Sequence, residues 1–253
     1  MAKTLGILLT TWDGDRHWFP QILDEFTRLG YPFVVNFDHC SWRTKSLFKA
    51  HPLFLDCYEN NNPNDPFDER HKGYALDLLV KHGFDWGTYL DTDDRFDRRA
   101  PQIIPEILAM DDVDWVWCPA LDLWGDGSHY RVDGPLGPSP DFDYWAGDPS
   151  KQRRDCFWNL KTGDWRYLHG DVHAPYFFAK DGSGRQARRR RSRLHVVHYG
   201  RMDARTALRK EDMWDRIYTR CLGKNRYKGG FYVHVATHEP ELVPFDYDTF
   251  DGD

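Results

Sequence analysis

The sequence is short of two features that mark many secreted and membrane proteins, namely paired cysteines and long hydrophobic runs. Its five cysteines are scattered, odd in number and without CxxC spacing, which argues against a disulfide framework and a structural zinc site. No apolar run approaches the roughly 20 residues that cross a bilayer, and the apolar N-terminal segment has no signal-peptide cleavage site. These absences predict a cytoplasmic protein in a reducing compartment, without a transmembrane segment.

Charge is divided unevenly along the chain, although the net charge of −6 hides this division. The segment 151–228 contains 21 lysines and arginines against 8 acidic residues, a net charge of +13 that leaves −19 for the remainder. Such a division predicts that the later segment faces an anion, either nucleotide phosphates or a polyanionic partner. A solvated basic surface is the alternative interpretation.

The first half of the chain alternates short apolar runs with segments of helical periodicity. The predicted strands cover residues 4–11, 31–38, 86–94 and 113–124. The predicted helices cover residues 19–29, which end at Gly30, 67–82, which end at Gly83, and 101–110. This alternation predicts an α/β protein with a mostly parallel central sheet flanked by helices. Ligands of such sheets bind beyond the carboxyl ends of the strands.

Acidic side chains follow three of the predicted strands. They are Asp13 and Asp15 after the first strand, Asp38 after the second, and Asp91, Asp93 and Asp94 in YLDTDD at the end of the third. A lone aspartate in a loop is more often an ordinary turn residue. Acidic side chains at three strand ends along one sheet edge instead favour a site for a cation or a ligand.

Together these features resemble the nucleotide-sugar glycosyltransferases with the GT-A fold, in particular those of family 2. The resemblance covers roughly residues 4–125 and is sharpest at Asp91-Thr92-Asp93, which is similar to the family's DxD motif. Lys72-Gly73 lies where these enzymes often carry a basic residue and a glycine. The likeness resumes at LHVVHYGRMDARTALRK (194–210), which is similar to a late strand that ends in a histidine and is followed by a basic helix.

The resemblance implies a donor- and metal-binding half at residues 1–125 and a smaller acceptor-binding and catalytic half at 126–253, with loops at 132–150 and 181–193. Its implied metal ligands are Asp91, Asp93 and His198. The implied donor contacts are Asp13, Asp38, Lys72, Asp91 and Arg201. A hard divalent cation neutralises the diphosphate of the leaving nucleotide. The implied cofactor is Mn²⁺ or Mg²⁺, with a histidine ligand favouring Mn²⁺, and the implied donor is a nucleoside diphosphate sugar, UDP-sugars first.

Histidines 195 and 198 also suggest a zinc pair, but residues three apart on a strand point to opposite faces. A shared zinc ion is therefore not expected, and an ordinary buried histidine is the alternative interpretation of His198.

An inverting transferase further needs a base for the acceptor hydroxyl. The stretch RYLHGDVHAPYFF (166–178) resembles the family region that supplies it, but Ala174 occupies the glutamate position. Asp171 is the first candidate and His173 the second, and lining of a polar groove is the alternative for both.

The predicted function is metal-dependent transfer of a hexose or pentose to an acceptor hydroxyl, with a glycan or a modified DNA base as the acceptor. Tyr144 and Trp145, in a loop rich in proline and glycine, are candidates for stacking on a sugar or a base. An arginine run is the candidate for contacts with acceptor phosphates, with a solvated loop as its alternative; its members are Arg188, Arg189, Arg190 and Arg191. A metal-dependent phosphohydrolase or nuclease and a carbohydrate-binding module are the alternative functions.

Overall fold

The computed structural model describes residues 2–61, 70–131, 153–162, 164–166, 177–179, 188–200, 204–205, 208–209, 212 and 239–251. The chain divides into two compact units. Unit 1 comprises Met1–Asp93, Ala100–Trp117 and Asp155–Ser192, and unit 2 comprises Asp94–Arg99, Cys118–Arg154 and Arg193–Asp253. The predicted functional division at residue 125 stays a prediction.

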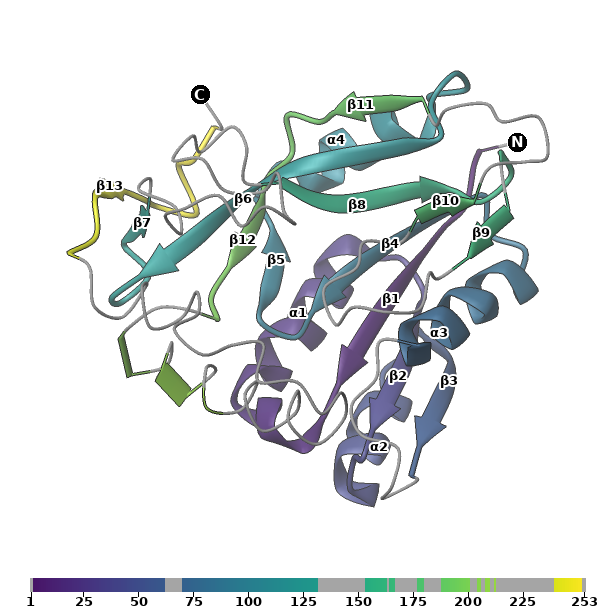
Figure 1. The fold of residues 1–253 in the computed structure, drawn as a ribbon, viewed down its shortest axis with the longest axis horizontal. Helices are drawn as coiled ribbons and strands as arrows, with labels where there is room; N and C mark the ends of the chain where they lie inside the picture. Colours follow the sequence, from purple (N-terminus) through teal and green to yellow (C-terminus); the bar gives the residue numbers. More distant parts are fainter. Residues whose placement is uncertain are drawn as a thin grey trace. The chain divides into compact units, whose positions relative to one another are not determined.

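Unit 1 has an α/β fold whose sheet is parallel at its centre (Figure 1). The strands are β1 (Leu5–Thr11), β2 (Phe33–Asp38), β3 (Phe54–Asn60), β4 (Trp86–Asp91) and β8 (Arg153–Asn159). Strand β1 lies between β2 and β4 and is parallel to both, β3 extends the sheet beside β2, and β8 is antiparallel to β4. All of β1 is buried, as expected for a central parallel strand. The predicted α/β class is confirmed.

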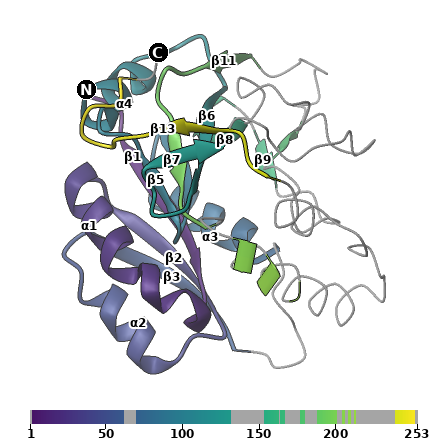
Figure 2. The ribbon, with the colours of Figure 1, turned by 90° about the vertical axis from the view of Figure 1, so that its left-hand side faces the viewer.

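Helices flank this sheet on both faces. They are the 3₁₀ helix η1 (Asp13–Trp18) and the α-helices α1 (Phe19–Leu29), α2 (Trp42–Lys49), α3 (Arg70–Lys81) and α4 (Ala100–Leu108). Figure 2 shows α1 and α2 on one face and α3 on the other. Helix α1 covers the predicted residues and ends because Gly30 adopts a φ of 73°, with its N–H bonded to the Phe26 carbonyl oxygen.

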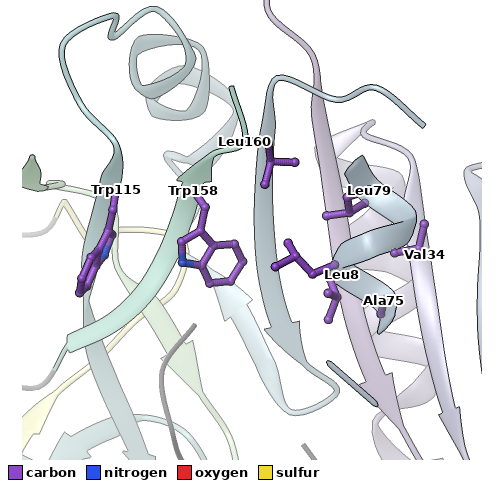
Figure 3. Close-up of a cluster of buried hydrophobic side chains, with 8 residues drawn as sticks. Leu8, Val34, Ala75, Leu79, Trp115, Trp158 and Leu160 are labelled. Atoms are coloured by element: carbon purple, nitrogen blue, oxygen red, sulfur yellow. The ribbon is translucent and has the colours of Figure 1, made fainter. Parts of the chain in front are cut away.

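The core of unit 1 forms where α3 lies on the central strands. Figure 3 shows Leu79 of α3 near Leu8 of β1, with Trp158 and Trp115 continuing the apolar row along the sheet. Gly6 allows the close approach of the helix, because a Cβ there would lie 2.6 Å from the Leu79 side chain. Helix α3 and strand β1 are therefore in close contact at this position.

Unit 2 contains a smaller sheet. Its strands are β5 (Asp94–Phe96), the later part of β6 (Trp115–Trp124), β7 (His129–Arg131), β12 (Val196–His198) and β13 (Leu242–Pro244). Strand β12 lies between β5, to which it is antiparallel, and β6, to which it is parallel. Strands β7 and β13 continue beside β6 in antiparallel pairs, and Figure 2 shows these two strands side by side. Leu121, Leu123, Val197 and Phe245 form its buried core.

Several sequence predictions need correction. Neither β3 nor α2 was predicted, because β3 is half-exposed with polar side chains and α2 is rich in polar residues. The strand that carries Asp91 is consequently the fourth along the chain. The predicted strand 86–94 is two strands, β4 and β5, separated by a turn. The predicted loop 181–193 contains strand β11 (Arg189–Arg191) in its described part.

The remaining described strands, β9 (Asp164–Arg166) and β10 (Phe177–Ala179), form an antiparallel pair.

No helix in the described part of the chain is long and apolar enough to span a membrane. Cys40, Cys57 and Cys118 are free thiols.

Candidate metal and donor site

The DxD segment forms a buried turn between two strands. Strand β4 ends at Asp91, Thr92 and Asp93 form the turn, and β5 begins at Asp94. The Thr92 hydroxyl donates a 2.8 Å hydrogen bond to the Asp15 carboxylate in η1, just after β1. The Asp91 carboxylate accepts a hydrogen bond from the Tyr89 hydroxyl. Side chains of unit 1 therefore hold the start of this turn in place.

A buried group of possible metal ligands follows directly. In the antiparallel pair of β5 and β12, His198 lies opposite Asp94, and its Nδ1 is 2.7 Å from the Asp94 Oδ1. Asp93 is the preceding residue of the chain, and the ligand atoms of Asp93, Asp94 and His198 all lie within 4.8 Å of one another. All three residues are buried. Two carboxylates placed so close in a buried position repel each other, and a cation relieves that repulsion.

The chemistry of this donor set fits a divalent metal. Carboxylate oxygens suit Mg²⁺ and Mn²⁺, and the imidazole of His198 shifts the preference toward Mn²⁺. The group contains Asp93 and His198, which the resemblance implies as ligands, and adds Asp94, which it does not. Asp91 is outside this group, and its role as a ligand stays a prediction. The third aspartate of YLDTDD was visible in the sequence, but nothing local indicated that a strand begins there.

Asp13 connects the carboxyl end of β1 to the start of α2. Its carboxylate accepts hydrogen bonds from the Thr44 hydroxyl at 2.6 Å, the Ser41 backbone N–H at 3.1 Å and the Arg16 guanidinium at 2.7 Å. Burial raises the pKa of Asp13, but these hydrogen bonds outweigh burial and lower the pKa to about 2. Asp13 is thus ionised, and it joins the carboxyl end of β1 to the start of α2. Its predicted contact with the donor stays a prediction.

Asp38 ends β2 in a second polar cluster at the same edge. Its Oδ1 accepts a 2.8 Å hydrogen bond from the Asn60 side chain at the end of β3, and lies 2.8 Å from the Nδ1 of His39. Among the described residues, His39 is the one residue other than glycine that has a positive φ, of 49°. Such backbone conformations are costly and concentrate at functional sites. Asp38 is buried while His39 is partly exposed, so the histidine is the accessible member of the pair.

Another buried aspartate, Asp97, connects several segments of unit 2 next to β5. Asp97 accepts hydrogen bonds from the His195 backbone N–H at 2.7 Å and from the Arg99 guanidinium at 2.8 Å. The Arg99 guanidinium also donates to the Asp251 carbonyl oxygen, and the Tyr247 hydroxyl donates to the Phe96 carbonyl oxygen at 2.8 Å. These hydrogen bonds connect β5, the residue before β12 and the segment 247–251.

The two histidines of LHVVHY consequently have different partners. His195 lies beside Asp97, at 3.5 Å, and His198 beside Asp94. The expectation that they do not share one zinc ion stays a prediction.

Several predicted site residues lie outside the described part of the chain, and their roles stay predictions. These residues are Tyr144, Trp145, Asp171, His173 and Arg201. Lys72 lies in the first turn of α3. Arg188 precedes β11, and the next three arginines of the run form that strand.

The solved structures with a similar fold include two bacterial proteins. TarS of S. aureus in complex with UDP-GlcNAc is 11% identical, with a TM-score of 0.40 over 49% of this chain and 36% of that chain. TarS in complex with UDP is 9% identical, with a TM-score of 0.43 over 62% and 46%. Glucosyl-3-phosphoglycerate synthase from Mycobacterium tuberculosis, in complex with Mn²⁺, UDP and phosphoglyceric acid, is 13% identical, with a TM-score of 0.35 over 47% and 43%.

The matched part is less than half the length of each of these chains. No protein-family model and no curated protein sequence matches this chain. The chain is thus similar to parts of TarS and of glucosyl-3-phosphoglycerate synthase in structure, at low sequence identity.

Proposed function

We propose that the chain is a metal-dependent glycosyltransferase that moves a sugar from a nucleoside diphosphate donor to an acceptor hydroxyl. The observation that carries the proposal is the buried Asp93–Asp94–His198 group, which begins two residues after β4 ends. A site at the carboxyl end of a central parallel strand is where α/β sheets bind their ligands.

The residues at this edge of the sheet have separate roles in the proposed reaction. Asp93, Asp94 and His198 would hold a divalent cation, which when bound supplies positive charge to the donor diphosphate. Thr92, held by Asp15, keeps the turn that carries Asp93 in one conformation. The partly exposed His39 beside the buried Asp38 offers a surface for the nucleoside.

The acceptor side of the proposal depends on residues outside the described part of the chain. Asp171 would remove the proton of the acceptor hydroxyl in an inverting reaction, with His173 as the second candidate. Tyr144 and Trp145 would stack on the acceptor, which is a glycan or a DNA base. The transferred sugar is a hexose or a pentose.

Metal-dependent nucleotide binding tests the proposal. Calorimetry would measure binding of UDP and UDP-GlcNAc with Mn²⁺, with Mg²⁺ and with EDTA, and electron paramagnetic resonance would measure Mn²⁺ binding alone. Asp94→Asn should weaken Mn²⁺ binding at least as much as the roughly 10- to 100-fold seen when a group that orients a ligand is lost. The matched control is Asp111→Asn, because Asp111 is exposed and pairs only with Lys3 among the described residues.

Two results would count against the proposal. One is nucleotide binding of full strength in EDTA for every nucleotide diphosphate tested. The other is an Asp94→Asn protein that binds Mn²⁺ as well as Asp111→Asn does. Rapid metal-dependent hydrolysis of the donor at a rate unaffected by any acceptor would instead support a phosphohydrolase.

A further inference from the structure

The arginine run forms an edge of unit 1. Strand β11 pairs in parallel with the first residues of β6, with Arg189 opposite Trp115, Arg190 opposite Val116 and Arg191 opposite Trp117. All three arginines are exposed, and β6 is the partner of β11 among the described strands (Figure 1). Arginine has no special preference for strands, so the contacts of its side chains must explain the position.

One face of this strand pair is neutralised by aspartates. The Arg188 guanidinium lies 3.0 Å from the completely buried Asp114 carboxylate, which also accepts a 2.7 Å hydrogen bond from the Arg188 backbone N–H. Arg190, two residues on and so on the same face, lies 3.8 Å from Asp112. The charges of these two arginines are therefore balanced within the protein, and Arg188 anchors the start of β11.

The opposite face carries two arginines over aromatic rings. The Arg189 guanidinium lies 4.3 Å from the ring centroid of Trp115, and the Arg191 guanidinium lies 5.3 Å from that of Trp117. In the described part of the chain, no carboxylate forms an ion pair with either arginine. This face consequently presents two positive charges that the described residues do not neutralise.

The contact with the rings leaves the guanidinium donors available. A guanidinium has five N–H donors in its own plane, in a fork that matches a phosphate in two parallel hydrogen bonds. Contact with an indole ring restrains each guanidinium group, so binding an anion costs less side-chain entropy. Residues two apart on a strand are separated by roughly 6.6 Å, so two such forks form a short row. A row of forks fits a polymer of repeated phosphates better than one isolated anion.

We propose that Arg189 and Arg191, backed by Trp115 and Trp117, bind the phosphate backbone of a nucleic-acid strand. The net charge of +13 on the segment 151–228 adds long-range attraction for such a partner. The proposal concerns binding alone and does not require the transferase activity. If both hold, the strand carries the acceptor.

Salt-dependent binding without donor or divalent cation tests this proposal. Fluorescence anisotropy would follow a labelled 20-nucleotide DNA single strand, and the same sequence as a duplex, at 50 to 200 mM NaCl. The test variant is Arg189→Met/Arg191→Met, because methionine removes the charge but still covers the indole rings. Arg190→Met is the matched control, since Arg190 is also exposed but lies on the opposite face of the strand, beside Asp112.

The expected result follows from counterion release. Two phosphate contacts contribute about 1.4 to the slope of log K against log salt for a single strand and about 1.8 for a duplex. Between 50 and 200 mM salt, the wild-type protein should therefore lose about 7-fold (single strand) or 12-fold (duplex) more affinity than the double variant. Arg190→Met should change the slope by less than half as much as Arg191→Met alone.

Other outcomes would overturn the proposal. They are absence of binding at 50 mM salt, equal slopes for the wild type and the double variant, and equal competition by polyglutamate at the same charge concentration. Equal slopes together with a lower melting temperature would mean that the arginines only cover the tryptophan row. If the double variant does not fold, Arg191→Met alone decides, with an expected slope change of about 0.7 to 0.9.

Discussion

Replacing Asp97 with asparagine should lower the free energy of unfolding by about 2 to 4 kcal/mol at pH 7. Burial raises the pKa of Asp97, but hydrogen bonds from His195, Arg99 and their backbone amides outweigh burial and lower the pKa from 3.8 to about 2. A difference of about 1.8 units corresponds to about 2.4 kcal/mol in favour of the ionised folded form. Breaking a buried ion pair from one side costs about 3 to 5 kcal/mol. Asparagine keeps one acceptor oxygen, so the loss should lie near the lower of these figures, at about 2 to 4 kcal/mol.

The pH dependence of this loss has a definite sign. Because the folded pKa of Asp97 is depressed, its contribution is complete above the unfolded pKa, close to 4, and disappears as the pH falls through about 2. The difference in stability between the wild type and Asp97→Asn should therefore shrink by about 2 kcal/mol between pH 6 and pH 2, because half of the folded protein still carries an ionised Asp97 at pH 2. Acid-sensitive groups elsewhere are common to both proteins and cancel in the difference.

Urea unfolding at a series of pH values measures both quantities. Asp111→Asn is the control, because an exposed ion pair contributes about 0 to 1 kcal/mol. Mn²⁺ binding should also weaken by roughly 10-fold in Asp97→Asn, since Asp97 joins β5 to the residue before β12 and these strands carry Asp94 and His198. A decrease in the free energy of unfolding below 1 kcal/mol that does not change with pH would refute the assignment of Asp97 as an ionised group that stabilises these strands.

Two further predictions concern the proposed reaction. Thr92→Val removes the hydrogen bond to Asp15 and should weaken Mn²⁺-dependent nucleotide binding by about 2- to 10-fold, the equivalent of about 0.5 to 1.5 kcal/mol; calorimetry should show recovery in Thr92→Ser, and equal losses in both variants would contradict the role of the hydroxyl. Asp171→Asn should retain metal-dependent donor binding while sugar transfer falls by on the order of 10² or more; near-normal transfer in a product assay would move the proposed role to His173.

The first half of the fold was predictable because its signals are local. Phe26 and Leu29 repeat at helical spacing and Gly30 ends the helix, and α1 ends as that pattern predicts. Strands β1 and β2 were predictable because a central strand buried on both faces needs a continuous apolar run. Strand β3 lies beyond β2 and is half-exposed, so Asp56 and Glu59 are compatible with it and interrupt any apolar pattern.

The site was less predictable because its parts come from distant segments. Asp93 could be recognised from its neighbours, but Asp94 and His198 are 104 residues apart and meet through the antiparallel register of β5 and β12. No local periodicity encodes that register, because each strand has only three residues. The arginine run was predicted as a loop for the same reason. Its strand depends on Trp115, Trp117 and Asp114, which lie more than 70 residues earlier.

The segment 91–97 also shows why a buried carboxylate alone does not indicate a metal. Asp97 is completely buried, yet Arg99 supplies its counter-charge and backbone amides satisfy its oxygens, so it needs no ion. The Asp93–Asp94–His198 group instead gathers two buried carboxyl groups and one buried imidazole, whose ligand atoms lie within 4.8 Å of one another. In the proposed function, these ligand atoms would hold a divalent cation. In the proposed function Asp93 and Asp94 therefore bind the metal ion, whereas Asp97 stabilises strand β5 beside them.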